Sequence, residues 1–280
     1  KDYGGLRRNM LRRASFAGSL KHAQPGMLTP QLVAAFLSSG LGQNPEEINP
    51  LDIFDKQSKI TRMGEGGIGS LDSVPDESRS VQPSHMGFID PVRTPESARA
   101  GVDSFLARTT RRGKDGRIYV PFKDARTGQT VHRSPQDVAD LTIGIPSQLG
   151  KGHARRVAVM RSGKLTYAPR NEVDLWLPNF ENAFSPLGAM VPMKSAVKAQ
   201  RMAMASRMFT QALPLVNPEA PLVQSGAMPD DPLVDRNRSY EEIYGEKMGA
   251  VRAKKSGKVV SVDRNQMVVQ YDDGKTETHE

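Results

Sequence analysis

The chain has 280 residues, a net charge of +8, a sequence pI near 9.7 and a mean hydropathy of −0.51. This length allows one or two ordinary domains, and the basic surface favours either a polyanionic partner or a place within a larger assembly. No cysteine occurs and no apolar run is long enough to cross a bilayer, which excludes disulfides, thiolate metal sites and a membrane partner and predicts a cytoplasmic protein.

Two helices are expected before residue 41. Residues 1–24 are rich in arginine, and helical spacing would place Arg8 and Arg12 on one face, so a short amphipathic helix is predicted. Its basic face either lies on nucleic acid or is simply solvated. A second helix is predicted from Thr29-Pro30 to Gly40, because proline suits the first helical turn and glycine suits the end.

The next segment contains Asn49-Pro50-Leu51 and a glycine-rich stretch, residues 63–68. Glycine permits a close backbone approach to a ligand, so this stretch either binds phosphate or serves as a flexible linker. Its candidate contact residues are Gly66 and Gly67, with the cations Lys56, Lys59 and Arg62 before them.

Residues 81–102 contain three prolines, at positions 83, 91 and 95, which exclude a continuous helix or a central strand. A stiffened loop presents polar side chains at low entropy cost. The loop is therefore interpreted either as a binding site or as a buried structural loop whose polar groups satisfy one another. These polar residues are His85, Asp90, Arg93, Thr94, Glu96 and Arg99.

The middle of the chain favours β structure. Residues 117–122 and 130–131 predict a hairpin, Ser134-Pro135 a helix start, and residues 157–160 and 165–167 a second hairpin. The stretch 151–170 carries Lys and Arg without acids, so it either follows a nucleic-acid backbone or forms a solvated strand face.

A helix is predicted between Pro192 and Pro214, because the residues between these prolines are largely good helix formers. Within it, Val197, Arg201, Met204 and Met208 share one face. A methionine stripe more often belongs to a core than to a site. An arginine inside such a stripe still needs an anion, either a carboxylate or a phosphate.

The C-terminal part begins acidic and ends in strands. Asp230, Asp231 and Asp235 suit Mg²⁺ by ligand type, but the surrounding prolines favour an exposed turn. Alternation on both sides of residues 263–266 predicts a β-hairpin, and Asp273-Gly274 a further turn.

Several of these motifs recur together in one known family. Pro-Ser-His-Met-Gly, Pro-Val-Arg-Thr-Pro-Glu and Gly101 resemble the signature loop of the second-largest (bacterial β) subunit of multisubunit DNA-directed RNA polymerases. The Asn-Pro-Leu and glycine-rich elements, the segment from Arg201 to Pro214 and the following Pro-Leu-Val resemble further elements of that subunit. The resemblance covers residues 25–102 and 174–271.

The resemblance implies an α+β, loop-rich, non-autonomous part of a polymerase β subunit, with short helices and β-hairpins and a C-terminal part that enters a β-barrel. The implied segments are basic N-terminal helices (1–40), a fork-like and drug-pocket-like region with the signature loop (41–102), a diverged mixed β region (103–189), an active-site helix (190–214), and an acidic linker with the start of the barrel region (215–280).

The resemblance also implies roles for single residues. Arg201 matches an arginine that reaches the triphosphate of the incoming nucleotide, and Glu96 matches a glutamate near the RNA 3′ end. Arg93 stands where the family has a first glutamate, and Arg99 stands where the family has an asparagine. Contacts to RNA or DNA are implied for Lys56, Lys59, Arg62, Gly66, Gly67, Arg93, Thr94, Arg99, Met204 and Met208.

In the family, Mg²⁺ is held by an N-A-D-F-D-G-D loop of the largest (β′-type) subunit, and this chain lacks that loop. The expected partners are that subunit or its fragments, other β-type fragments, template DNA, nascent RNA and nucleoside triphosphates. The loose match in the middle suggests a split β subunit encoded by a phage, working in the host cytoplasm or the virion. The alternative is a non-catalytic, basic nucleic-acid-binding or virion structural protein that keeps the polymerase fold.

Overall fold

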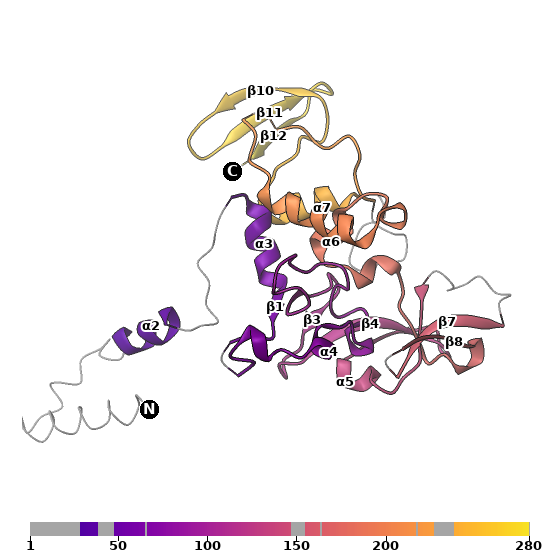
Figure 1. The fold of residues 1–280 in the computed structure, drawn as a ribbon. Coiled ribbons are helices and arrows are strands. Elements are labelled where there is room, and N and C mark those ends of the chain that lie inside the picture. Colours follow the sequence, from indigo (N-terminus) through magenta and orange to yellow (C-terminus); the bar gives the residue numbers. More distant parts are fainter. Residues whose placement is uncertain are drawn as a thin grey trace, which may run out of the picture.

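The computed structural model describes residues 29–38, 48–64, 66–146, 155–162, 164–216, 218–226 and 238–279 (Figure 1). The amphipathic helix predicted within residues 1–24, the helix end at Gly40 and the turn around Asp230 lie outside these ranges. The α-helices are α2 (Thr29–Leu37), α3 (Pro50–Ser58), α4 (Asp76–Arg79), α5 (Pro135–Val138), α6 (Pro186–Met190), α7 (Ala199–Gln211) and α8 (Tyr240–Lys247). Single 3-10 turns are η2 (Leu71–Ser73), η3 (Pro83–His85), η5 (Arg170–Glu172), η6 (Phe180–Ala183) and η7 (Lys194–Ala196). None of the described helices has the length and apolar character needed to span a membrane.

A seven-stranded sheet forms the centre of the fold, with the order β3-β4-β9-β6-β7-β8 and β5 paired to β4. Its strands are β3 (Arg111–Arg112), β4 (Ile118–Asp124), β5 (Thr130–Arg133), β6 (Ile143–Gly144), β7 (Arg156–Arg161), β8 (Lys164–Pro169) and β9 (Leu175–Trp176). The hairpins β4–β5 and β7–β8 confirm the two predicted from alternation, and Ser134 begins α5 with a capping box as expected. Buried aromatic side chains of β4 and the signature loop, Phe122 and Phe88, pack together in the core of this sheet.

A second core joins the helices. Side chains of α6, α7 and α8 form it, and Leu51 and Phe54 of α3 and Val92 of the signature loop pack against it. In Figure 1, α3, α6 and α7 lie between the large sheet and the C-terminal strands. A short two-stranded sheet, β1 (Lys59–Thr61) with β2 (Asp103–Phe105), connects the end of α3 to the end of the signature loop.

The C-terminal strands β10 (Gly257–Val262), β11 (Met267–Tyr271) and β12 (Thr276–His279) form an antiparallel sheet in that order. Its first turn confirms the predicted hairpin, and Gly274 takes a φ of +81° in the second turn. Within the described residues this sheet is open, with β10 and β12 as its edges. The fold is thus α+β and rich in loops, as expected.

The helix predicted between Pro192 and Pro214 is shorter than expected. It begins only at Ala199, because Met193 takes a left-handed conformation with φ +53° and is followed by a 3-10 turn. Val197, expected on the helix face, therefore lies in extended backbone before the helix. The C-terminal end agrees with the prediction, since the helix ends before Pro214.

Candidate active-site surface and nucleic-acid contacts

The signature loop, residues 81–102, is anchored near its middle by two buried side chains. Phe88 is fully buried in the core of the large sheet. The Asp90 carboxylate accepts hydrogen bonds from the main-chain N–H groups of Val92 (2.8 Å), Arg93 (3.1 Å) and Ser185 (2.7 Å). Ser185 is also the N-cap of α6, so Asp90 fixes the loop against the start of that helix.

Arg93 connects the loop to two helices. Its guanidinium forms a bidentate ion pair with Asp55 of α3, in which Nε lies 3.2 Å from Oδ1, and it donates to the Ser206 hydroxyl of α7 at 2.9 Å. It also lies over the Phe105 ring, 4.5 Å from the centroid. Arg93 is only 6% exposed. This geometry gives Arg93 a structural role, and a contact to nucleic acid stays a prediction.

Asn49 makes a second connection between α3 and α7. As the N-cap of α3 it accepts a hydrogen bond from the N–H of Leu51. Its side-chain amide donates to the carbonyls of Phe209 (3.0 Å) and Ala212 (2.6 Å). The carbonyls at a helix end lack partners within the helix, so one residue completes the start of α3 and the end of α7.

The side chains of Thr94 and Arg99 stabilise the second half of the loop. The Thr94 hydroxyl accepts from the N–H of Gly101 at 2.8 Å and donates to the carbonyl of Asp103 at 2.9 Å. The buried Asp103 carboxylate faces Lys59 and Arg99, each at 3.4 Å. Two of the predicted cationic contacts therefore converge on one carboxylate, and only Arg99 is exposed.

The glycine-rich stretch forms a tight turn against the loop. The N–H of Gly67 donates to the carbonyl of Gly64 at 2.9 Å, and a Cβ at Gly67 would lie 2.4 Å from the carbonyl oxygen of Arg62. Arg62 in turn donates to the carbonyl of Gly101 at 3.1 Å. Gly66, with φ +82°, has open space where a Cβ would lie. Lys56 lies apart from this turn and pairs with Asp52.

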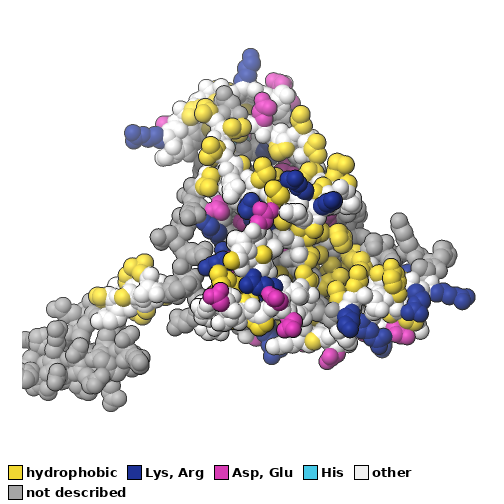
Figure 2. All heavy atoms as spheres, viewed as in Figure 1, with side chains coloured by type: hydrophobic (Ala, Val, Ile, Leu, Met, Phe, Trp, Pro, Cys, Tyr) yellow, Lys and Arg dark blue, Asp and Glu magenta, His cyan; other side chains and the backbone are white. Residues whose placement is uncertain are grey.

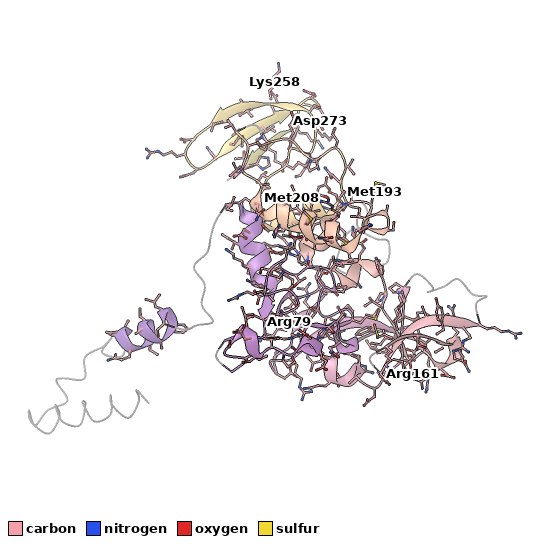
Figure 3. All side chains as sticks on the ribbon, in the orientation of Figure 1. Arg79, Arg161, Met193, Met208, Lys258 and Asp273 are labelled. Atoms are coloured by element: carbon pink, nitrogen blue, oxygen red, sulfur yellow. The ribbon has the colours of Figure 1, made fainter. Side chains whose placement is uncertain are left out.

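Helix α7 presents opposite faces to the core and to solvent. Met202, Ser206 and Thr210 are buried at intervals of four residues. Arg201 and Met208 are exposed on another face with the half-buried Met204 between them, and Figure 3 labels Met208 on this helix. Met204 and Met208 are therefore not part of the buried hydrophobic core within the described residues. The Arg201 guanidinium contacts the Met204 sulfur at 3.7 Å and has no ion-pair partner among those residues.

The loop and the exposed side of α7 meet at one ion pair. Glu96 lies 3.5 Å from Arg207, and both side chains are well exposed. The predictions named Glu96 but missed Arg207, which lies six residues after Arg201 on the same helix. They also missed Asp55 and Ser206. A chemical signal could have found Asp55: a buried arginine such as Arg93 requires an anionic partner, for example a carboxylate.

Burial shifts two pKa values near the loop. Desolvation raises the pKa of Asp55 above its ordinary value of 3.8, and the Arg93 guanidinium counteracts that rise. Desolvation lowers the pKa of His85 below 6.5, and the charge of Arg62 lowers it further. His85 accepts a hydrogen bond from the N–H of Gln82 at 3.1 Å, which suits the neutral imidazole.

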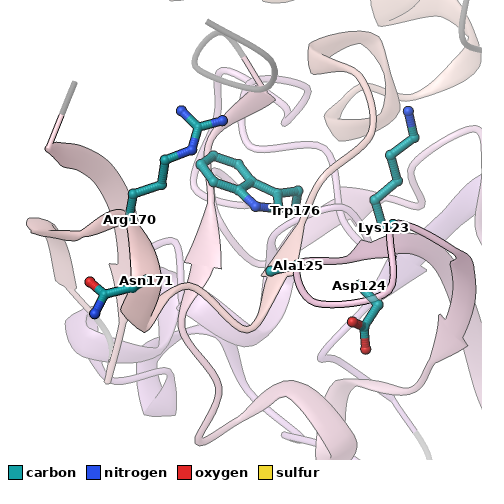
Figure 4. A pocket seen from close by; sticks show the side chains of 7 residues that line it. Lys123, Asp124, Ala125, Arg170, Asn171 and Trp176 are labelled. Carbon is teal, nitrogen blue, oxygen red and sulfur yellow. The ribbon is translucent and has the colours of Figure 1, made fainter. Parts of the chain in front are cut away.

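An open pocket of about 500 Å³ lies elsewhere, between the β4–β5 turn and η5 (Figure 4). None of the predicted site residues lines it. Its lining is Lys123, Asp124, Ala125, Gly128, Arg170, Asn171 and Trp176. The described residues contain no group of three His, Cys, Asp or Glu side chains placed to hold a metal ion.

Known proteins resemble the chain over most of its length. The family RNA polymerase Rpb2, domain 3, matches residues 43–111, which include the signature loop and the glycine-rich turn. The DNA-directed RNA polymerase β subunit of Thermus thermophilus is 29% identical over 247 residues, covering 86% of this chain and 21% of that subunit. The β subunit of Bartonella tribocorum is 30% identical over 244 residues, covering 84% of this chain and 17% of that subunit.

The chain spans about a fifth of the length of these curated relatives. The match includes α3, the signature loop and the residues that tie them together. These matches support the chain as a central fragment of the β subunit of DNA-directed RNA polymerase.

Proposed function

We propose that the chain acts within a multisubunit DNA-directed RNA polymerase, a nucleotidyltransferase, and positions the incoming nucleoside triphosphate and the RNA 3′ end. The observation that carries this proposal is the exposed face of α7. It presents Arg201 without an anionic partner among the described residues, beside the loop that carries Glu96. A cation on a rigid helix suits a triphosphate, because preorganised charge stabilises a reacting phosphate at little reorganisation cost.

Each exposed group has a role in this proposal. Arg201 neutralises the triphosphate, and Met204 and Met208 give an adaptable apolar surface beside it. Glu96 and its loop hold the RNA end, with Arg207 fixing the direction of the Glu96 carboxylate. The glycine-rich turn, held against the loop by Arg62, guides the DNA at the fork. Lys59 and Arg99 already share the Asp103 carboxylate, so their contacts to nucleic acid would be secondary.

The catalytic Mg²⁺ belongs to a partner in this proposal. The described residues offer no cluster of ligands for it, so they do not fit a resident metal ion. We place the ion on the largest, β′-type subunit. The chain's own residues bind and orient the substrates, and other β-type fragments, template DNA and nascent RNA complete the assembly.

The finer proposal is a split β subunit encoded by a phage, which works in the host cytoplasm or is carried in the virion. This finer proposal is supported by a difference between the signature loop of this chain and the family pattern. Arg93 there forms a buried pair with Asp55, where the family pattern has a glutamate. Mass spectrometry of the complex that copurifies with the tagged chain tests this directly, because a stoichiometric β′-type partner and further β-type chains are expected.

Enzyme kinetics on that purified complex test the role of Arg201. Arg201→Ala should lower kcat/KM for nucleotide addition about 10- to 100-fold, the range expected for loss of a hydrogen bond to a charged group, while template DNA binding stays intact. Arg126→Ala, in an exposed turn of the large sheet, is the matched control and should leave the kinetics unchanged.

Two outcomes would contradict the proposal. Weakened DNA binding in Arg201→Ala, without a kinetic effect on nucleotide addition, would indicate a nucleic-acid-binding module. Recovery of the chain alone, or only with virion structural proteins, would indicate a non-catalytic protein that keeps the polymerase fold.

A further inference from the structure

The β7–β8 hairpin lies at the edge of the large sheet, away from α7. Strand β8 pairs only with β7 among the described strands, and its first four residues are exposed. Leu165 and Tyr167, two residues apart on the same strand face, are 65% and 63% exposed. Exposed apolar and aromatic side chains on an edge strand mark either a site where a partner binds or an aggregation risk.

The same hairpin is rich in basic residues. Between positions 155 and 172 there is one acid, Glu172, among the basic residues Arg155, Arg156, Arg161, Lys164 and Arg170. Figure 2 shows dark-blue side chains over this end of the molecule, and Figure 3 labels Arg161 there.

The tip of the hairpin places like charges opposite each other. Arg161 pairs in register with Lys164, and such a pair destabilises a hairpin unless an anion lies nearby. Glu172 approaches Arg161 at 3.0 Å, but both side chains are about half exposed, so the pair is weak. Lys164 and Arg155 have no ion-pair partner among the described residues, which leaves the edge with unbalanced positive charge.

We propose that this edge binds single-stranded nucleic acid, with a base stacked on the Tyr167 ring, a phosphate bound by Arg156 on the same strand face, and further phosphates bound at the hairpin tip by Arg161 and Lys164. Aromatic rings flanked by cations are the usual means of binding single strands, because every base has a face that can stack. Arg156 already reaches across the hairpin and donates to the Tyr167 carbonyl at 2.7 Å, so a cation is fixed close to the stacking residue.

A single strand fits this edge better than a duplex or a protein. A duplex keeps its bases stacked inside and offers nothing to Tyr167. A protein strand added to β8 would be favoured by the free main-chain edge, but the excess of positive charge around the edge would remain unbalanced. Charge and aromatic character together therefore select a polyanion with exposed bases.

The test is fluorescence anisotropy of labelled oligothymidylate and oligouridylate, about 16 nucleotides long, with the full chain. Tyr167→Ala should weaken binding about 5-fold or more, whereas Tyr167→Phe should bind like the wild type. The double variant Arg161→Gln/Lys164→Gln should also weaken binding and reduce the slope of log Kd against log salt by about 1.4.

Two controls separate this edge from other basic surfaces. Lys254→Gln/Lys255→Gln removes the same charge from the C-terminal sheet, where both lysines already pair with Glu277 and Asp273, and should change binding little. Arg201→Ala should also leave oligonucleotide binding unchanged. The two proposals can thus fail separately.

Three results would overturn the inference. The first is equal binding by all the hairpin variants, which would mean that the cations only protect an edge strand from aggregation. The second is a loss of binding in the charge variant with none in Tyr167→Ala, which would remove the stacking step. The third is crosslinking of position 167 to a protein chain, and not to nucleic acid, in the purified complex.

Discussion

Replacing Arg93 with methionine is expected to be among the most damaging single changes in this chain. The Arg93 and Asp55 side chains are 7% and 4% exposed, so the substitution leaves a carboxylate buried without its partner. Breaking a buried pair in this way costs about 3–5 kcal/mol of unfolding free energy. Arg207→Met is a matched control, because it removes an arginine from an exposed ion pair with Glu96 of the same loop and should cost about 0–1 kcal/mol.

The loss of unfolding free energy in Arg93→Met should depend on pH in a defined direction. Burial already raises the pKa of Asp55 above 3.8, and removing Arg93 removes the charge that counteracts this rise. A raised folded-state pKa gives stability that is present below the unfolded value and is lost as pH rises through the folded value. The destabilisation relative to wild type should therefore be larger near pH 8 than near pH 4.

Urea unfolding of the purified chain, followed by far-UV circular dichroism at both pH values, measures these differences. The double variant Asp55→Leu/Arg93→Met should be less destabilised than Arg93→Met alone, because no unpaired charge remains buried. A cost below about 1 kcal/mol for Arg93→Met, or an equal cost at both pH values, would refute the reasoning.

The remaining predictions concern the same loop and use the same unfolding measurement. Thr94→Val should cost about 1–3 kcal/mol, because it leaves the N–H of Gly101 without its acceptor; a cost within error of zero would show that water replaces the hydroxyl. Gly101→Ala combines a φ of +71° with a Cβ 2.6 Å from a main-chain oxygen, so it should destabilise more than Gly128→Ala, which has a φ of +69° and open space; equal costs would contradict the steric argument. The lowered pKa of His85 gives stability that is present above pH 6.5 and is lost as pH falls through the folded value, so His85→Gln should flatten the fall in stability between about pH 7 and pH 5.

The sequence predicted the elements whose signals are local. Alternating residues around Asp263–Gln266 predict a hairpin directly, and so do the strands around residues 161–164. The prolines of residues 81–102 correctly excluded regular structure there beyond the short 3-10 turn Pro83–His85. The predicted helix start near Pro192 was wrong, because a left-handed residue such as Met193 has no sequence signal when it is not glycine or asparagine.

The sequence did not predict which polar groups would pair. Arg93 meets Asp55 across 38 positions and Ser206 across 113, and no local pattern carries such a pairing. The resemblance to the polymerase subunit did not help either, since Arg93 replaces a glutamate in the family pattern. The contact of Arg93 to nucleic acid stays a prediction, and the fold buries its side chain against Asp55.

The buried Arg93 also bears on the exposed Arg201. Five residues separate Ser206 from Arg201, which places their side chains roughly 140° apart around α7. Because the Ser206 hydroxyl is bonded to Arg93, the helix cannot rotate about its axis without breaking that bond. Asn49 holds the end of the same helix through two carbonyls. The signature loop thus fixes the direction in which α7 presents Arg201, even though loop and arginine lie on different segments of the chain.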